Sequence, residues 1–97
     1  MITVIAHYRT QPGAADRVGL LLAQHAQASE AEPGCRCFRV HQGHDDESLF
    51  GLYEVYDNLE AFEAHRRSSH FRVNIEQTLV PLLLEREWRV YGPAFSG

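Results

Sequence analysis

Hydrophobic and polar residues alternate in four short stretches of the chain, and each stretch predicts a β-strand. The first runs from Ile2 to Arg9 and places apolar side chains at its even-numbered positions. The other three are predicted over residues 35–41, 49–56 and 87–91. Polar or glycine-containing segments separate the strands, which is typical of turns between short elements.

Helical spacing of apolar residues occupies two of the intervals between strands. The first predicted helix covers residues 14–31, has His25 on its apolar stripe, and ends at Pro33-Gly34. The second begins at Leu59, after the capping residues Asp57 and Asn58. A further helical segment begins at Ser68 or Ser69 and contains Pro81, which we expect to kink it.

The predicted order β-α-β-β-α-β is that of an α+β, ferredoxin-like protomer. Its four-stranded sheet is antiparallel, and right-handed crossovers place both helices on one face. The 97 residues form one domain, residues 1–97. The strands carry apolar residues at both parities, for example Ile2 and Ile5, so neither face is clearly solvated. We therefore expect a homodimer that packs through its sheet faces.

Composition narrows the possible partners. The chain has a net charge of −4, and all its basic side chains are arginines scattered without a basic stripe, which argues against nucleic-acid binding. Apolar runs such as Leu79–Leu84 are too short to span a membrane, and no signal-peptide pattern opens the chain, so we expect a cytoplasmic protein. Cys35 and Cys37 should share one strand face as reduced thiols.

The segment from Leu52 to Phe71 concentrates aromatic side chains, a carboxylate and two histidines, as expected for a small-molecule pocket. His65 is the first candidate for a catalytic base, although a purely local structural role is equally compatible with the sequence. His70 could contact substrate, but a local role at a helix start is favoured. Glu54 is the second catalytic candidate; it would orient a histidine or, slightly preferred, pair with Arg39, Arg86 or Arg89. The other predicted substrate-binding residues are His7, Tyr53, Tyr56, Phe62 and Phe71.

Metal binding is not expected from the sequence. His65 and His70 are five positions apart, which on a continuous helix places them on different sides. His41 and His44 lie with two aspartates in a polar turn that offers no apolar shell around an ion. Together with His25, we expect these two histidines to be surface or packing residues.

The sequence resembles the antibiotic biosynthesis monooxygenase domain family over essentially its whole length. The resemblance rests on the first thirteen residues and on four motifs, Glu32-Pro33-Gly34-Cys35, Tyr53-Glu54-x-Tyr56, Ala61-Phe62-x-x-His65 and Ser69-His70-Phe71. It implies a dimeric α+β barrel with a pocket between sheet and helices. It also implies oxidation of a small aromatic, quinol- or anthrone-like substrate by dioxygen, without flavin, haem or metal.

Three alternatives remain open. One family member processes a phosphorylated signal, so an isomerase acting on a small carbonyl metabolite is possible; Arg66-Arg67 would then be the nearest anion site, although a solvated helix face is favoured for this pair. A non-catalytic ligand-binding module would keep the pocket without needing His65. Haem degradation, known for the same fold, is disfavoured because Ile75 stands where those relatives have the axial histidine, and Ala6-His7 where they have an asparagine.

Overall fold

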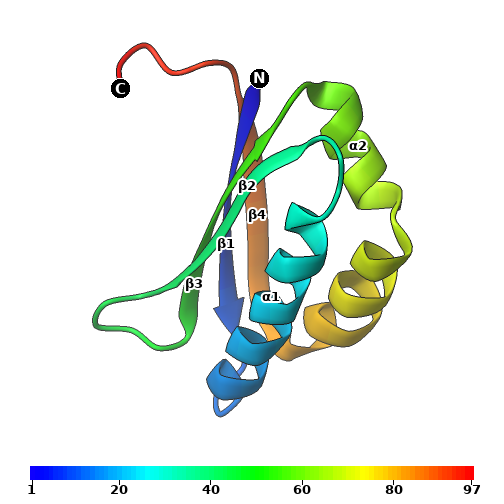
Figure 1. Ribbon diagram of the computed structural model, residues 1–97. Coiled ribbons are helices and arrows are strands. Elements are labelled where there is room, and N and C mark those ends of the chain that lie inside the picture. The colour runs from blue at the N-terminus through cyan, green and yellow to red at the C-terminus, as the bar shows by residue number, and fades with distance from the viewer.

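The protein has the predicted order of elements, as the computed structural model of residues 1–97 shows (Figure 1). The elements are β1 (Ile2–Thr10), α1 (Ala15–Glu30), β2 (Cys35–Gln42), β3 (Leu49–Tyr56), α2 (Leu59–Arg67), η1 (Phe71–Leu79), η2 (Val80–Leu82) and β4 (Leu83–Tyr91). Of these, η1 is a π-helix and η2 is a short 3₁₀ turn. No helix is long and apolar enough to cross a membrane.

The four strands form one sheet in the order β2-β3-β1-β4, and every neighbouring pair is antiparallel. All the helices lie on the same side of this sheet (Figure 1). The predicted ferredoxin-like α+β fold is therefore confirmed.

The main core lies between the sheet and the helices. Alternate residues of the strands face inward, so that Val4 and Leu52 meet Val18 and Leu22 of α1. Each fully buried aliphatic side chain of this kind contributes about 1.5–3 kcal/mol relative to exposure. The opposite face of the sheet carries no helix, and it exposes Ile5 and its direct cross-strand partner Tyr53.

β4 begins at Leu83, four residues earlier than predicted. It is an edge strand paired with β1 alone, and most of its residues stay exposed on both faces. An edge strand whose side chains stay largely exposed needs no apolar alternation. For this reason, the segment 83–86 gave no strand signal.

The two cysteines point to different faces, contrary to the prediction. The pairing register shifts between Cys35 and Cys37: Cys35 lies opposite Tyr56, and Cys37 lies opposite the preceding residue, Val55. The extra residue, Arg36, forms a β-bulge that rotates the strand by one position. Cys35 is thus buried in the core while Cys37 is half-buried, and both are free thiols.

The segment after α2 is a π-helix and not a kinked α-helix. Its backbone bonds span five residues, as in the bond from the Val80 amide to the Ile75 carbonyl. Such a wide turn brings every fourth residue to the same side, so Phe71, Ile75 and Leu79 are all buried. Pro81 lies in the 3₁₀ turn that ends the segment, where its missing amide hydrogen is not needed.

Gly34 allows the loop between α1 and β2 to approach α2 closely. A Cβ atom at this position would lie 2.5 Å from the Cβ of Ala61. We expect Gly34→Ala to lower the free energy of unfolding by about 1–3 kcal/mol, because backbone or helix must shift to relieve the clash. Urea unfolding measures the change. Gly51→Ala is the matched control, since nothing lies within 4 Å of its added methyl group; equal losses in both variants would contradict this interpretation.

Candidate active site

A small, largely apolar pocket lies between the sheet and the helices α2 and η1. Strands β1, β3 and β4 form its floor, and the helices form its roof. The lining residues are Val4, Ala6, Tyr8, Glu54, Phe62, His65, Arg66, Phe71, Arg86 and Trp88. The closed cavity has a volume of about 20 Å³, enough for roughly one water molecule.

Glu54 places a carboxyl group in the floor of this pocket. It is 5% exposed, and the Tyr56 hydroxyl donates a 2.6 Å hydrogen bond to its Oε1. No arginine forms an ion pair with it, so the expected partner among Arg39, Arg86 and Arg89 is wrong. Burial raises the pKa of Glu54 to about 7, although the Tyr56 hydrogen bond works in the opposite direction.

Two buried tyrosines, Tyr8 and Tyr56, lie close to the Glu54 carboxyl group. Burial, and then the nearby Glu54 carboxylate, raise the pKa values of Tyr8 and Tyr56 well above the ordinary value for tyrosine. Both hydroxyls therefore stay protonated, and that of Tyr56 donates its hydrogen bond to Glu54. Tyr8 lines the pocket, whereas Tyr56 lies behind Glu54 and holds its carboxylate in place.

Arginine side chains cover the mouth of the pocket. The Arg66 guanidinium lies 4.6 Å from the centre of the Trp88 ring and 5.7 Å from that of Phe71. Arg86 lies 5.2 Å from the same Trp88 ring. Trp88 is therefore a pocket residue that sequence reasoning missed: its strand was predicted, but it lies far along the chain from the segment 52–71, in which the site was predicted. Arg66 is exposed, as predicted, but it is also part of the pocket.

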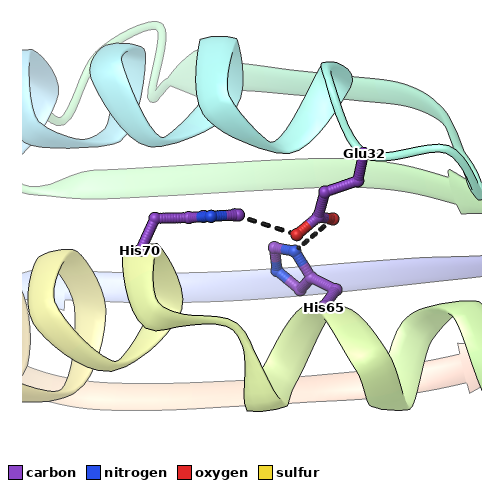
Figure 2. A group of neighbouring side chains, drawn as sticks. All are labelled: Glu32, His65 and His70. Carbon is purple, nitrogen blue, oxygen red and sulfur yellow. Dashed lines mark hydrogen bonds and ion pairs between the residues drawn. The ribbon is translucent and has the colours of Figure 1, made fainter.

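A second polar group lies behind His65, where Glu32 contacts two histidines (Figure 2). Glu32 Oε1 is 2.9 Å from Nδ1 of His65, and Oε2 is 2.9 Å from Nε2 of His70. His25 completes the cluster: its ring centre lies 5.2 Å from that of His65 and 5.4 Å from that of His70. This cluster of Glu32, His25, His65 and His70 joins α1 and its following loop to α2 and to the start of η1.

Burial determines the protonation of the cluster. It lowers the pKa of His65 to about 3, with further lowering by His25 and His70, and it lowers the pKa of His25 to about 4. It also raises the pKa of Glu32 to about 7. The imidazole rings of His25 and His65 are thus neutral at neutral pH.

Local structure explains how two histidines five positions apart reach one carboxylate. Asn58 starts α2 by accepting a 2.9 Å hydrogen bond from the Ala61 amide. Ser68 then ends it with extended backbone, while its hydroxyl donates to the His65 carbonyl and accepts from the Phe71 amide. The helix is not continuous between His65 and His70, so the argument that placed them on different sides was wrong.

The structure separates the other predicted site residues. Phe62 and Phe71 line the pocket, as expected. His7 and Tyr53 do not, because they point to the open face of the sheet, where His7 lies 3.6 Å from Glu87. Strand alternation forces this placement, since their neighbours Ala6, Tyr8, Leu52 and Glu54 all face inward. His41 and His44 are exposed, as expected.

Sequence reasoning missed Glu32 and His25 as neighbours of the site. His25 is fully buried on the apolar stripe of α1, where it could equally have been an ordinary core residue. Glu32 belongs to the Glu32-Pro33-Gly34-Cys35 motif. The signal that could have identified it is its position: it is a charged residue directly before a Pro-Gly turn that leads into a buried strand.

Comparisons with known proteins agree on one family. The profile of the antibiotic biosynthesis monooxygenase family matches residues 1–77. Rv0793 of Mycobacterium tuberculosis, provisionally named a monooxygenase, is 31% identical over 70 residues, which are 72% of this chain and 68% of that protein.

Solved structures show the same relationship. That of Rv0793 superimposes with a TM-score of 0.88 at 27% identity and covers 98% of this chain and 96% of its own. The structure of PA3566 from Pseudomonas aeruginosa superimposes with a TM-score of 0.87 at 29% identity, and the match covers 96% of this chain and 94% of that protein. A provisionally assigned antibiotic biosynthesis monooxygenase from Nitrosomonas europaea superimposes with a TM-score of 0.91 at 24% identity. The match covers 98% of this chain and 100% of that one, which shows the shared fold. The chain therefore belongs to the antibiotic biosynthesis monooxygenase family.

Proposed function

We propose that the protein is a monooxygenase that oxidises a small electron-rich aromatic compound, quinol- or anthrone-like, with dioxygen. The observation that carries this proposal is the buried Glu54 carboxyl group. It lies in a pocket walled by Phe62, Phe71 and Trp88, and no cation is paired with it. Aromatic walls suit a flat ring, and an unpaired buried carboxylate is a ready proton acceptor.

The substrate itself supplies the electrons in this reaction. Glu54 removes a proton from the activated carbon or its enol, and the resulting anion passes one electron to dioxygen. The substrate radical and superoxide combine to form a carbon–oxygen bond and, with a proton, a hydroperoxide. Loss of the remaining hydrogen on that carbon and cleavage of the O–O bond release water and leave a carbonyl. A CH₂ group and O₂ thus become C=O and H₂O.

We assign the role of proton acceptor to Glu54 and a supporting role to His65. General base catalysis is most effective when the pKa of the base lies near the working pH. The pKa of Glu54 is about 7, whereas burial lowers that of His65 to about 3. A neutral imidazole is better suited to a hydrogen bond with the substrate oxygen. Tyr8 and Arg86 line the same pocket and could stabilise the negative charge that develops there.

An aromatic ring can enter only if the mouth of the pocket opens. A cavity that accepts benzene has a volume of about 150 Å³, against about 20 Å³ in the closed pocket. Arg66 and Trp88 both retain solvent exposure, and an exposed cation–π contact is worth only about 0.5–1 kcal/mol. We therefore propose that substrate displaces the Arg66–Trp88 stack and closes the pocket with its own ring.

Glu54→Gln should lower turnover by about 100-fold or more, because the amide cannot accept the proton. In the unmodified protein, turnover should rise about tenfold from pH 6 to pH 8, as the Glu54 carboxyl ionises around its raised pKa of about 7. The groups facing Glu54 are Tyr8, Tyr56, His65, Arg66 and Arg86. Dioxygen uptake by metal-stripped protein, with a panel of hydroquinones and anthrones, measures both effects.

Glu63→Gln is the matched control, since Glu63 is exposed on α2 and should keep full turnover. Thermal unfolding at pH 5 checks that the Glu54 variant is folded. Uptake that persists in a folded Glu54→Gln variant, or a flat pH profile between 6 and 8, would remove Glu54 from the mechanism.

His65→Ala should lower turnover at least tenfold while leaving the fold intact, because the substrate oxygen loses a hydrogen-bond partner in the pocket. Stopped-flow or electrode assays under saturating substrate separate this loss from weaker binding. His44→Ala, in the exposed turn before β3, controls for loss of a histidine as such. If turnover stays within twofold of normal, His65 has only a structural role.

A second candidate is an isomerase acting on a small carbonyl metabolite. The guanidinium groups of Arg66 and Arg86, on either side of Trp88, favour it because they could bind an anionic substituent. Glu54 would then move a proton next to the carbonyl, without dioxygen. Absence of dioxygen uptake across the panel, combined with Glu54-dependent exchange of substrate protons in D₂O, would favour this alternative.

We also propose that two copies pack through the open face of the sheet. This face exposes Ile5 and Tyr53, which are 37% and 45% accessible and lie side by side in register. Burying such apolar side chains against a second sheet would remove them from water. It would also leave the pocket, on the helix side, free for substrate.

Tyr53→Glu should convert the dimer into a monomer, because a buried charge without a partner is costly at an interface. Light scattering after size exclusion should give twice the chain mass of 11.1 kDa for the unmodified protein and a single chain mass for the variant. Val73→Glu, equally exposed but on the helix layer, should remain dimeric. A monomeric unmodified protein would exclude this assembly.

A further inference from the structure

We propose that Glu32, His65 and His70 form a binding site for a divalent transition-metal ion. The three residues come from three different segments, the loop after α1, helix α2 and the start of η1, and their side chains point toward one another (Figure 2). One ligand atom from each lies within 4.8 Å of the other two. The sequence argument against such a site assumed a continuous helix, which the break at Ser68 removes.

The spacing of the donor atoms suits an ion after a small adjustment. Glu32 Oε1 is hydrogen-bonded to Nδ1 of His65 at 2.9 Å, and Oε2 lies 2.9 Å from Nε2 of His70. An ion would replace the hydrogen bond with little movement, because adjacent ligands of an octahedral ion with bonds of about 2.1 Å are about 3.0 Å apart. Two atoms that share such an ion can be at most about 4.2 Å apart. The most distant pair, which lies within 4.8 Å, therefore has to close by at most about 0.6 Å, which small side-chain rotations can provide.

Unsatisfied nitrogen atoms are an independent observation in favour of a ligand. Nε2 of His70 is buried and faces the Glu32 carboxylate, but it is not aligned to form a hydrogen bond. Nδ1 of the neighbouring His25, a residue only 1% exposed, is likewise buried without a partner. Buried polar atoms are normally satisfied. An ion would satisfy His70, while His25 packs its ring against those of both histidine ligands.

The structure also provides a route for the ion. A surface cleft of about 300 Å³ leads to the site between the loop after α1 and helix α2. It is lined by Glu32, Pro33, Gly34, Ala61, Ala64 and His65. The cleft and the aromatic pocket share only His65, so an ion and a substrate could reach opposite sides of one imidazole ring.

The donor set indicates the class of ion. Two imidazoles and one carboxylate suit Zn²⁺, Co²⁺, Ni²⁺ or Fe²⁺, whereas Mg²⁺ and Ca²⁺ prefer sites made of oxygen atoms. A bound ion would link α1, α2 and η1 at one point. It would therefore hold the roof of the aromatic pocket in place.

Calorimetric titration of metal-stripped protein with Zn²⁺, and visible absorption with Co²⁺, test the site. We expect one ion per chain, binding at micromolar concentration or tighter, and a melting temperature that rises with Zn²⁺ concentration. Glu32→Gln and His70→Gln should each weaken Zn²⁺ binding at least tenfold. His44→Gln should leave it unchanged, since His44 and its neighbouring aspartates form a separate exposed turn.

Two results would overturn the proposal. One is the absence of stoichiometric Zn²⁺ and Co²⁺ binding to the folded protein. The other is binding that His44→Gln removes and His70→Gln does not, which would mean an adventitious ion only. If Glu32→Gln fails to fold, the partly exposed His70 still provides the test. These measurements report ion binding and not turnover, so they can fail independently of the proposed monooxygenase activity.

Discussion

The hydrogen bonds of Ser68 set the geometry on which both polar sites depend. Its hydroxyl donates to the carbonyl of His65 and accepts from the amide of Phe71, while its backbone is extended. The chain therefore turns between α2 and η1 and does not continue as one helix. A straight helix could bring only one of its faces to the sheet, whereas the turn directs Phe62, His65 and Phe71 to the same interior.

The carboxyl groups of Glu54, which is buried, and Glu32, which is half-buried, differ because their neighbours differ. Glu54 has a tyrosine hydroxyl as its partner, and the aromatic pocket lies beside it. Glu32 lies between two imidazole rings, next to a cleft open to solvent. Burial raises the pKa of each to about 7, but only Glu54 lines the pocket with aromatic walls. One fold thus places the proposed proton acceptor, Glu54, and the proposed ion ligand, Glu32, close to the same histidine, His65.

The sequence predicted the architecture well because its central strands and α1 have regular apolar patterns. β3, from Leu49 to Tyr56, has the predicted bounds. The sequence predicted a new helical segment from Ser68 or Ser69, in agreement with the break at Ser68. It did not reveal the bulge at Arg36 or the π-helix, which depend on irregular backbone. Each changes which side chains meet, and neither leaves a periodic signal. Glu32 and Trp88 were missed because they lie far along the chain from the segment 52–71 and reach His65 only in the folded chain. His7 and Tyr53 were included although strand alternation turns them away.

The composition of the core argues that this interior is shaped by function as well as by stability. Apart from its tyrosines and Cys35, five of its buried residues are polar or charged: Thr10, His25, Ser29, Glu54 and His65. A domain of 97 residues has little surplus stability, and apolar side chains of similar size would avoid the cost of desolvating a carboxyl group and two imidazoles. Glu54 and His65 line a pocket, and His25 packs against the ring of His65. Residues that weaken a core but meet at one cavity are best explained by the chemistry of that cavity.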